Sequence, residues 1–246
     1  MEAEFLSQIL IVAAVFAVAV LYSSVGHAGA SGYLAVMALL SVAPSVTRPT
    51  ALVLNIFVAT IAAFQFYRAG FFDRRIFASF AATSVPFAFL GGMIVLPTNV
   101  HKILLGAVLL IAAARLAWNG TSEKRFVTPS VWLALILGAV MGLLSGLTGV
   151  GGGIFLTPVL LLTGWTETKK AAGISAMFIL VNSISGLLGN YAQLGNLPAS
   201  VWTWIAAAVV GGFIGSTLGS RRFDSMTLRR VLSVVLLIAG LKLIFT

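Results

Sequence analysis

Five glycines fall within residues 146–153, in the middle of a long hydrophobic stretch. Glycine lacks a side chain, so it weakens a helix and permits bent backbone. A looser run with Gly26, Gly29 and Gly32 interrupts an earlier hydrophobic stretch. Inside a bilayer, broken backbone persists only where protein or a cavity satisfies its polar groups. The sequence therefore predicts two broken helices rather than two straight ones. We call the run at 26–32 the first glycine break and the run at 146–153 the second glycine break.

The composition is that of an integral membrane protein. Hydrophobic residues make up 60% of the 246 residues and charged residues 9%, against roughly 25% charged residues in a soluble domain. The net charge of +9 comes from basic residues in short loops between apolar stretches, where the positive-inside rule places them, so nucleic-acid binding is not expected. The chain has no cysteine, which excludes disulfides and thiolate metal sites, and we expect no metal or other cofactor.

Ten apolar stretches predict an all-α, polytopic integral membrane protein. They span residues 5–22, 30–43, 51–67, 76–96, 103–118, 131–147, 153–163, 171–189, 199–219 and 231–245. A helix that crosses a bilayer needs about 20 residues, and roughly 17 at least. Stretches 30–43 and 153–163 are shorter than this, and each directly follows a glycine break.

The two halves of the chain resemble each other. Residues Thr47–Ala51 align with Thr168–Ala172, and at the same offset Gly32 falls on Gly153. An ordered series of such matches favours an internal duplication. The predicted organisation is a first membrane repeat at 1–118, a linker at 119–130 and a second membrane repeat at 131–246.

The basic loops predict how the repeats are oriented. The strongest basic cluster is Arg221, Arg222, Arg229 and Arg230, whereas the connection at 190–199 has no charge. If all ten stretches cross, every basic loop lies inside and the uncharged connection lies outside, as the positive-inside rule requires. Five crossings in each half then invert one repeat relative to the other. The linker is expected to be cytoplasmic, and both termini to lie outside.

The glycine breaks predict an anion-binding site. A helix that starts directly after a break leaves the amides of its first turn without partners, and these amides and the helix dipole attract anions. All six carboxylates lie at the ends of the stretches or in loops, which disfavours a cation carrier, because that would need buried Asp or Glu. Close helix packing is the alternative explanation of the glycines. Broken helices in corresponding places of two halves are typical of transporter sites.

His27 is the ionisable residue within the breaks. Its reference pKa of about 6.5 allows it to donate a hydrogen bond to an anion or to carry a proton that moves with the anion. The alternative is a neutral histidine bonded to a carbonyl that the broken helix leaves free. Because the apolar stretches contain no carboxylate that could orient it, we expect no serine nucleophile and no catalytic residue.

The other candidate substrate-binding residues are hydroxyls, amides, glycines and basic residues. They are Ser23, Ser24, Gly26, Gly29, Ser31, Gly32, Arg48, Asn55, Thr148, Gly149, Gly151, Gly152, Gly153, Lys169 and Asn182. Back-bonding to helix carbonyls is the structural alternative for the serines, and cross-helix hydrogen bonding for the asparagines. Arg48 and Lys169 would form an anion funnel at each mouth, or else snorkel to the interface. The expected partners are a small anionic substrate, protons and membrane lipid, with a homo-oligomer left open.

The chain resembles the TauE/SafE family of membrane transporters, the sulfite exporter or toluenesulfonate-uptake permease family. The resemblance covers nearly the whole chain and is most specific in Gly149–Ile154 with Pro158, which looks like the family's glycine-rich motif. The first-half copy departs from this motif, with His27 and Ser31 in a run that has fewer glycines. The resemblance implies proton-coupled secondary transport of sulfur-containing anions, such as sulfite or organosulfonates, across a bacterial or archaeal inner membrane.

The sequence favours a carrier that works by alternating access, in which inverted halves rock about the paired breaks. An anion channel on the same scaffold is the alternative, and it would need a continuous pore with weak binding at several sites. An enzyme or a non-transporting sensor is disfavoured, because the chain has no cysteine, no carboxylate inside its apolar stretches and no room for a soluble module. Because the loops leave no room for a soluble ATPase module, an ion or substrate gradient would drive transport.

Overall fold

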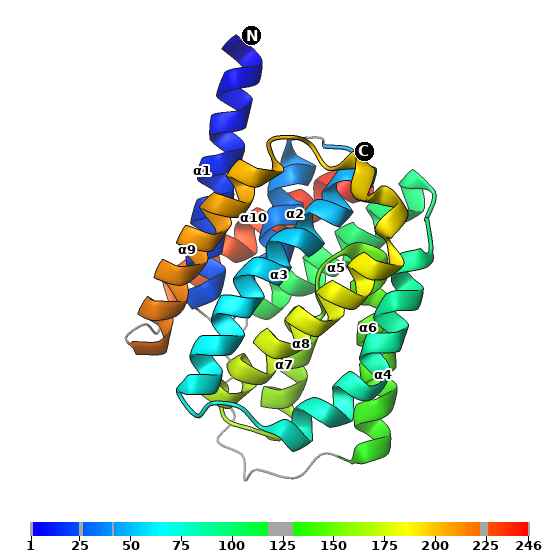
Figure 1. Ribbon diagram of the computed structural model, residues 1–246, viewed down its shortest axis with the longest axis vertical. Helices are drawn as coiled ribbons and strands as arrows, with labels where there is room; N and C mark the ends of the chain where they lie inside the picture. Colours follow the sequence, from blue (N-terminus) through cyan, green and yellow to red (C-terminus); the bar gives the residue numbers. More distant parts are fainter. Residues whose placement is uncertain (1, 25–26, 41, 118–129, 222–225, 246) are drawn as a thin grey trace.

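The computed structural model describes residues 2–24, 27–40, 42–117, 130–221 and 226–245, and over these ranges the chain forms ten α-helices, one 3-10 helix and no strand. Figure 1 follows the helices in chain order. Their bounds are α1 Glu2–Ser24, α2 Ala30–Leu39, α3 Pro44–Arg68, α4 Arg74–Met93, α5 Thr98–Ala117, α6 Val131–Thr148, α7 Gly153–Leu162, α8 Thr168–Gly189, η1 Tyr191–Asn196, α9 Val201–Arg221 and α10 Met226–Phe245. The prediction of an all-α fold is confirmed for the described part of the chain.

Local sequence signals set the ends of α3 and α4. Pro44 is the first residue of α3. The backbone N–H of a first helical residue makes no hydrogen bond within the helix, so proline, which lacks this N–H, is well tolerated there. The Asp73 carboxylate accepts hydrogen bonds from Arg75 N at 2.9 Å and Ile76 N at 3.1 Å, and so caps the start of α4. Between the two helices Gly70 has a φ of 77°, which suits a residue without a side chain.

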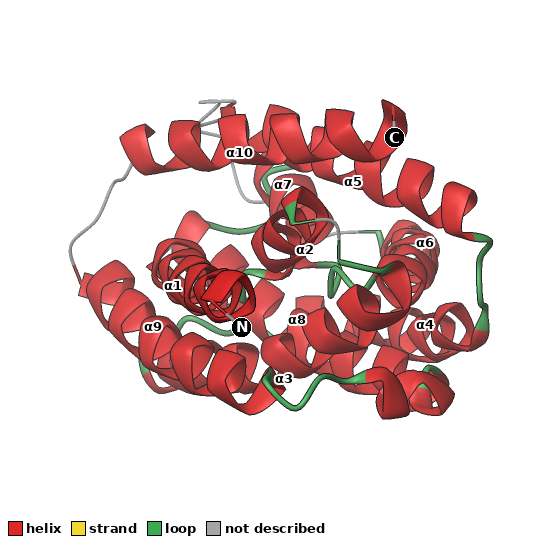
Figure 2. Ribbon diagram, turned by 90° about the horizontal axis from the view of Figure 1, so that it is seen from above, coloured by secondary structure: helices red, strands yellow, loops and turns green. Residues whose placement is uncertain are grey.

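The helices pair in a way that relates the two halves of the chain. The first helix of one half packs on the fourth helix of the other half, as α1 on α9 and α6 on α4. The third helices, α3 and α8, pack on each other, and so do the fifth helices, α5 and α10. Figure 2 shows α1 and α9 on one side of the bundle, α4 and α6 on the other, and α2 and α7 between them. Corresponding helices of the two halves thus either pack on each other or exchange partners.

Each of the ten predicted stretches corresponds to a helix. The largest difference is at α3, which begins at Pro44 rather than near residue 51, because the polar pair Thr47 and Arg48 interrupts the apolar run without ending the helix. Among the described residues, six helices are long and apolar enough to cross a membrane, namely α3, α4, α5, α6, α8 and α9. The apolar parts of α1 and α10, Gln8–Ser24 and Leu236–Phe245, are shorter. Ten crossings therefore stay a prediction.

The helices that follow the glycine breaks are short, as the sequence predicted. α2 and α7 each contain 10 residues. At 1.5 Å per residue each is about 15 Å long, half of the roughly 30 Å of hydrocarbon in a bilayer. Figure 1 shows α2 in the upper half of the molecule and α7 in the lower half. Neither helix is long enough to cross a membrane alone.

Glycines bring α4, α6 and α8 into backbone contact. A Cβ atom at Gly142 or Gly146 of α6 would collide with the carbonyl oxygens of Ser84 and Ala88 on α4. We call the set of such positions in these three helices the glycine seam; it contains Gly91, Gly92, Gly138, Gly142, Gly146 and Gly189. Small residues at helix interfaces are typical of membrane proteins, where close van der Waals contact holds helices together. The packing explanation of glycine thus applies to Gly146.

The outward faces of the helices are apolar. Large hydrophobic side chains that are exposed include Phe64, Ile136, Leu188 and Phe213, with exposed fractions of 59%, 62%, 60% and 59%. A soluble protein rarely exposes so much apolar surface over several neighbouring helices. Together with the six long apolar helices, this surface identifies a multi-pass membrane protein.

Candidate functional site

The two glycine breaks end in the same backbone feature. Gly29 directly precedes α2 with a φ of 96°, and Gly152 directly precedes α7 with a φ of 80°. Both values lie in the left-handed region that L side chains rarely adopt, and neither helix start has a side-chain cap within the described ranges. The Phe155 amide in the first turn of α7 donates to the Gly152 carbonyl at 3.1 Å, whereas the amides of the first two residues of each helix have no acceptor within the helix and are left to a ligand, to water or to other protein groups. The structure pairs Gly29 with Gly152, where the sequence alignment paired Gly32 with Gly153.

The second break is strongly bent. Gly149 ends α6 with a φ of 82°, and its N–H donates to the Ser145 carbonyl at 2.8 Å. Gly151 and Gly152 both have a φ of 80°. Three of the four residues between α6 and α7 therefore need a conformation that glycine adopts at no steric cost. This requirement explains why the run is so rich in glycine.

A chain of hydrogen bonds joins the first break to α7 and α8. His27 Nε2 lies 3.2 Å from Thr157 Oγ1, and Thr157 Oγ1 lies 2.7 Å from Ser175 Oγ. Thr157 is one turn into α7, so the contact brings the first break beside the start of the helix that follows the second break. Each hydroxyl can donate or accept. The chain of contacts can therefore adjust to either protonation state of the imidazole.

Asn55 lies at the second break. Its Nδ2 donates to Ser183 Oγ at 3.3 Å, while its Oδ1 has no hydrogen-bond partner among the residues that the structure describes. A Cβ atom at Gly151 would lie 2.8 Å from Asn55 Nδ2 and 3.1 Å from Ser183 Oγ. Both polar residues are fully buried, and an unpaired buried polar atom costs about 1–3 kcal/mol. The amide of Asn55 is thus placed to meet a ligand or a water at the bent backbone.

Gly152 and Gly153 also lie in tight packing. A Cβ atom at Gly152 would lie 2.8 Å from the Phe178 ring, and one at Gly153 would lie 2.5 Å from Ile179 Cγ1. Close packing against α8 therefore accounts for the absence of a side chain at Gly153. At Gly152 the positive φ is an additional reason, since any other residue would be strained there.

Ser31 and Gly32 lie where α2 packs on α1. The Ser31 hydroxyl donates to the Tyr22 hydroxyl at 3.0 Å, and both residues are buried. A Cβ atom at Gly32 would lie 2.8 Å from the Tyr22 ring and would also strike Val18. These contacts join α2 to α1 directly after the first break, and they favour the structural explanation of Gly32.

The remaining serine candidates have different surroundings. Ser24 donates to the Leu21 carbonyl at 2.7 Å, which is the back-bonding expected of a helical serine. Ser23 is fully buried, and its Oγ has no partner in the described structure; it lies near Gly212 of α9. Gly26 lies outside the described residues.

The Arg48 side chain caps the end of α4. Its Nη1 donates to the Ile94 carbonyl at 2.9 Å, and its Nη2 donates to the carbonyls of Gly91 at 2.6 Å and Gly92 at 2.7 Å. These carbonyls lie at a helix end, where no later residue of the helix can bond them. Arg48 is only 3% exposed, and its backbone lies against Gly149. The guanidinium thus connects the end of α4 to the second break.

Asn182 and Thr148 are hydrogen-bonded within the protein. The Asn182 amide accepts from the Ser84 hydroxyl on α4 and donates to the Phe178 carbonyl at 2.9 Å. The Thr148 hydroxyl donates to the Leu144 carbonyl at 2.7 Å. The contacts of Asn182 are those of cross-helix hydrogen bonding, which was the alternative to substrate contact.

Lys169 lies exposed in the first turn of α8. Its Nζ lies 5.1 Å from the centre of the Phe71 ring, a distance typical of a cation–π contact. The next residue, Lys170, pairs with Glu167 at 3.8 Å. Lys169 therefore belongs to a polar helix end, separate from the hydrogen-bonded groups at the breaks.

Sequence reasoning did not assign a site role to Thr157, Ser175 or Ser183. A signal for the two serines exists in the sequence, because Ser175, Ile179 and Ser183 are spaced by four residues and so lie on one face of α8. This is the face that Gly151 and Gly153 approach. Two hydroxyls on one face of an apolar helix indicate a polar neighbour, and here the neighbour is the second break.

The donor set at the breaks suits an anion. It consists of backbone N–H groups, hydroxyls, one amide and one imidazole, all of which can donate hydrogen bonds. Among the described residues, no group of three or more His, Cys, Asp or Glu side chains is placed to hold a metal ion. The arrangement can therefore bind a small oxyanion through hydrogen bonds and the positive ends of two helix dipoles.

Comparison with known proteins gives concordant matches. Residues 11–243 match the family model described as Sulfite exporter TauE/SafE. A protein of Sinorhizobium fredii named Probable membrane transporter protein y4hK is 40% identical over 237 residues, which cover 94% of this chain and 96% of that protein. Probable membrane transporter protein YjnA of Bacillus subtilis is 24% identical over 239 residues, covering 89% and 92% of the two chains. No solved structure matches the chain.

Proposed function

Because the chain belongs to the TauE/SafE sulfite exporter family of membrane transporters, we propose that it carries a small sulfur-containing anion, sulfite or an organosulfonate, across the inner membrane. The anion binds at the glycine breaks, between the starts of α2 and α7. Transport is secondary, coupled to protons, and proceeds by alternating access.

One observation carries this proposal: the contact between His27 and Thr157 brings together two helix starts that have glycine rather than a capping side chain. Each start presents backbone N–H groups and the positive end of a helix dipole. The hydroxyls of Thr157 and Ser175 lie beside them. Sulfite and sulfonates have three oxygens that accept hydrogen bonds, so their shape and charge match several converging donors.

The carboxylates of the described structure support an anion over a cation. Asp73 caps the start of α4, and Glu167 pairs with Lys170 at the start of α8. Both of these carboxylates therefore lie at helix ends and are engaged there, and Glu2 and Glu4 lie by position in the first turn of α1. A cation desolvated at the breaks would lack the negative charge that makes its binding favourable.

The inverted arrangement of the two repeats is part of the proposal. It is supported by the pairing of α1 with α9 and α6 with α4, and by the self-pairing of the third and fifth helices, which are the contacts of two halves related by a twofold axis. It is also supported by the basic loops, which gather on one side if both halves cross five times. Rocking of helices about the paired breaks would then expose the breaks to each side in turn.

His27 is proposed as the proton carrier. It is a titratable group at the breaks, and its hydrogen bond to Thr157 connects it to the groups that would bind the anion. Protonation would add a positive charge beside the anion, so proton binding and anion binding would strengthen each other. An anion and a proton would then move together.

Transport into proteoliposomes tests the proposal. The purified chain should take up sulfite or an organosulfonate, and a pH gradient should accelerate uptake, whereas carboxylates of similar size should compete weakly. An internal load of unlabelled anion should accelerate entry of labelled anion, because counterflow requires a carrier that alternates between the two sides. Failure to transport any sulfur anion in the panel would contradict the substrate assignment. Uptake without acceleration by counterflow would favour the anion channel.

A further inference from the structure

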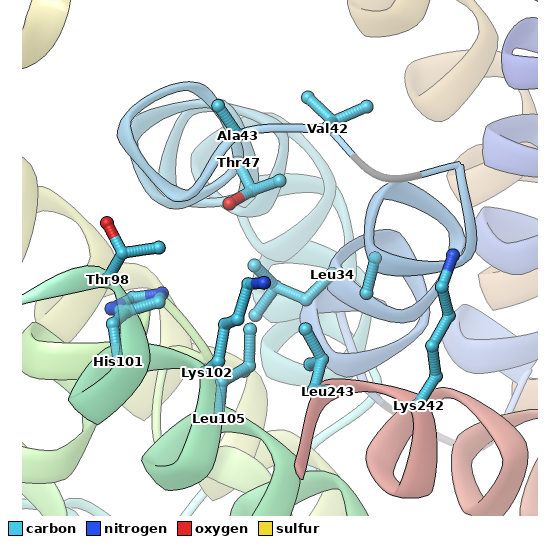
Figure 3. A pocket seen from close by; sticks show the side chains of 11 residues that line it. Leu34, Val42, Ala43, Thr47, Thr98, His101, Lys102, Leu105, Lys242 and Leu243 are labelled. Carbon is cyan, nitrogen blue, oxygen red and sulfur yellow. The ribbon is translucent and has the colours of Figure 1, made fainter. Parts of the chain in front are cut away.

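A cavity of about 260 Å³ lies between the end of α2, the starts of α3 and α5, and the last turns of α10. It is lined by Leu34, Ala38, Val42, Ala43, Thr47, Thr98, His101, Lys102, Leu105, Lys242 and Leu243. Figure 3 shows Lys102 reaching from α5 into the middle of this cavity, with Lys242 on its α10 side and Thr98 and His101 opposite. The cavity is near the lower limit of ligand-pocket volumes, roughly 300 Å³, and so suits a small molecule.

The charge of the cavity lining is positive. Lys102 and Lys242 line it, and none of its eleven lining residues, all within the described ranges, is acidic. Lys242 Nζ donates to the Leu39 carbonyl at 2.8 Å, which holds this ammonium group at the end of α2. The helices α3 and α5 begin beside the cavity, whereas α2 and α10 end beside it, so positive and negative ends of helix dipoles offset each other and the two lysines supply the positive charge.

His101 supplies an independent sign of a ligand. Its side chain lines the cavity and is only 4% exposed, and its Nε2 has no hydrogen-bond partner among the described residues. Buried polar atoms are nearly always paired with protein or water. The hydroxyl-bearing residues Thr47 and Thr98 also line the cavity. A ligand that accepts hydrogen bonds would find partners on three sides.

The positive-inside rule does not account for the two lysines. In the proposed topology Lys102 and Lys242 lie at the outer face, opposite the basic loops at the ends of α3 and α9. Lysines placed against the rule need another explanation, and this cavity provides one.

We propose that this cavity is a second anion-binding site, which holds a small oxyanion between Lys102 and Lys242 with His101 as a further hydrogen-bond partner. Leu34 and Ala38 place the cavity about one and a half to two and a half helical turns along α2 from Gly29, or about 8–14 Å at 1.5 Å per residue. The site is therefore separate from the glycine breaks, and in the proposed transport cycle it would lie on the route to them. By attracting anions, the site raises their local concentration at the outer face of the protein before an anion moves to the glycine breaks.

The recognised chemistry is a sulfur or phosphorus oxyanion of single or double charge. A transported sulfonate and the phosphate of an anionic lipid headgroup share this chemistry. The assignment of the site to the transport pathway rests on the proposed function, whereas anion binding at Lys102 does not.

Binding and transport should be measured on the full chain in nanodiscs and proteoliposomes of phosphatidylcholine, with sulfite and methanesulfonate as probes. Lys102→Gln should raise the KM for transport about fivefold to tenfold at low salt with little change in maximal rate, and the difference should shrink in high salt. Lys102→Arg should stay close to the wild type, since it keeps the charge. Arg74→Gln removes a charge from an exposed position at the start of α4 and should leave KM unchanged.

Calorimetric titration separates the two sites. The wild type should bind the probes at two sites. Lys102→Gln and His101→Gln should each weaken binding at the cavity. Gly151→Ala should weaken the other site while binding at the cavity persists. In nanodiscs with added phosphatidylglycerol, loss of probe binding at the cavity in the wild type would identify the lipid headgroup as the occupant, and the oxyanion site would stand.

Two results distinguish failure of this site from failure of the proposed function. If the wild type transports sulfite but Lys102→Gln has an unchanged KM, salt dependence and titration curve, the cavity is not an anion site. If the wild type transports no sulfur anion yet Lys102→Gln still loses anion binding, the cavity site stands and the proposed function fails.

Discussion

The Oγ1 of Thr157 lies 3.2 Å from Nε2 of His27, across the two halves of the chain. His27 belongs to the first glycine break, and Thr157 to the helix that follows the second. A ligand bound at either helix start therefore lies within reach of groups from both halves. In the proposed mechanism, this contact would connect anion binding to movement of α7 relative to the first break.

His27→Gln should separate anion binding from proton coupling. Glutamine keeps a hydrogen-bond donor but cannot take up a proton at physiological pH, whereas an imidazole is a side chain that can. We expect anion binding and anion-for-anion exchange to persist, and acceleration of uptake by a pH gradient to disappear. Simultaneous recording of proton and anion flux checks this. Wild-type proton movement in the variant would assign His27 a structural role.

Gly151→Ala should reduce transport about tenfold or more. An alanine would be strained at a φ of 80°, by roughly 1–2 kcal/mol, and its Cβ would lie 2.8 Å from Asn55 Nδ2. Since about 1.4 kcal/mol corresponds to a factor of ten in binding, the strain and the displaced amide together give this effect. Gly195→Ala is the matched control, because a Cβ there meets nothing within 4 Å. Equal loss of transport in both variants would contradict a specific role of the bent backbone at Gly151.

Arg48→Gln should lower the stability of the protein by about 3 kcal/mol. The substitution leaves most of the bonds to the carbonyls of Gly91, Gly92 and Ile94 unmade, and bonds from a charged donor contribute about 1.5–3 kcal/mol each. The melting temperature in detergent measures the loss. Arg48→Lys should recover part of it, because an ammonium group can still donate to some of these carbonyls. An unchanged melting temperature would show that the cap is not needed for stability.

Asn182→Leu and Asn55→Leu should differ in what they change. The amide of Asn182 is bonded on both sides, to Ser84 and Phe178, so its loss should cost about 1–3 kcal/mol of stability and affect anion affinity less. Asn55 makes one long bond, and its Oδ1 has no partner in the described structure, so its loss should weaken anion binding more than it lowers stability. Thermal melting and anion titration of both variants decide the comparison.

Single cysteines should report the two faces of the membrane, because the chain contains no cysteine. Ala192 lies exposed in the connection between α8 and α9, and Ala69 lies exposed at the end of α3. In the inverted arrangement an impermeant thiol reagent labels the Ala192→Cys variant from outside, whereas the Ala69→Cys variant stays protected in intact cells. Labelling of both variants from the same side would contradict five crossings in each half.

Helix positions could be predicted from the sequence because apolar length and glycine breaks report them directly. α2 and α7 follow from the breaks at Gly29 and Gly152, since backbone that glycine bends cannot continue a straight helix. The start of α3 was misplaced because Thr47 and Arg48 interrupt the apolar pattern. Their polarity is satisfied by tertiary contacts, such as those of Arg48 with α4, that the local sequence does not contain.

The candidate site could be predicted only in part. The glycines and His27 stand out because they depart from their surroundings, whereas Thr157 and Ser175 are ordinary residues of apolar helices until the fold brings them to His27. His101 was overlooked for the same reason: its significance comes from burial without a partner for Nε2 in the described structure and from the cavity beside it. Such properties depend on distances between helices that are far apart in the sequence.

The glycine seam also limits how the molecule can deform. Where the backbone of Gly142 and Gly146 lies directly on α4, there are no intervening side chains that could change rotamer and let one helix slide along the other. Such helices can only separate, which loses van der Waals contact over the whole interface at once. α4, α6 and α8 are therefore expected to behave as one stationary block. Displacement during a transport cycle would then fall to helix pairs outside the seam, such as α2 and α10.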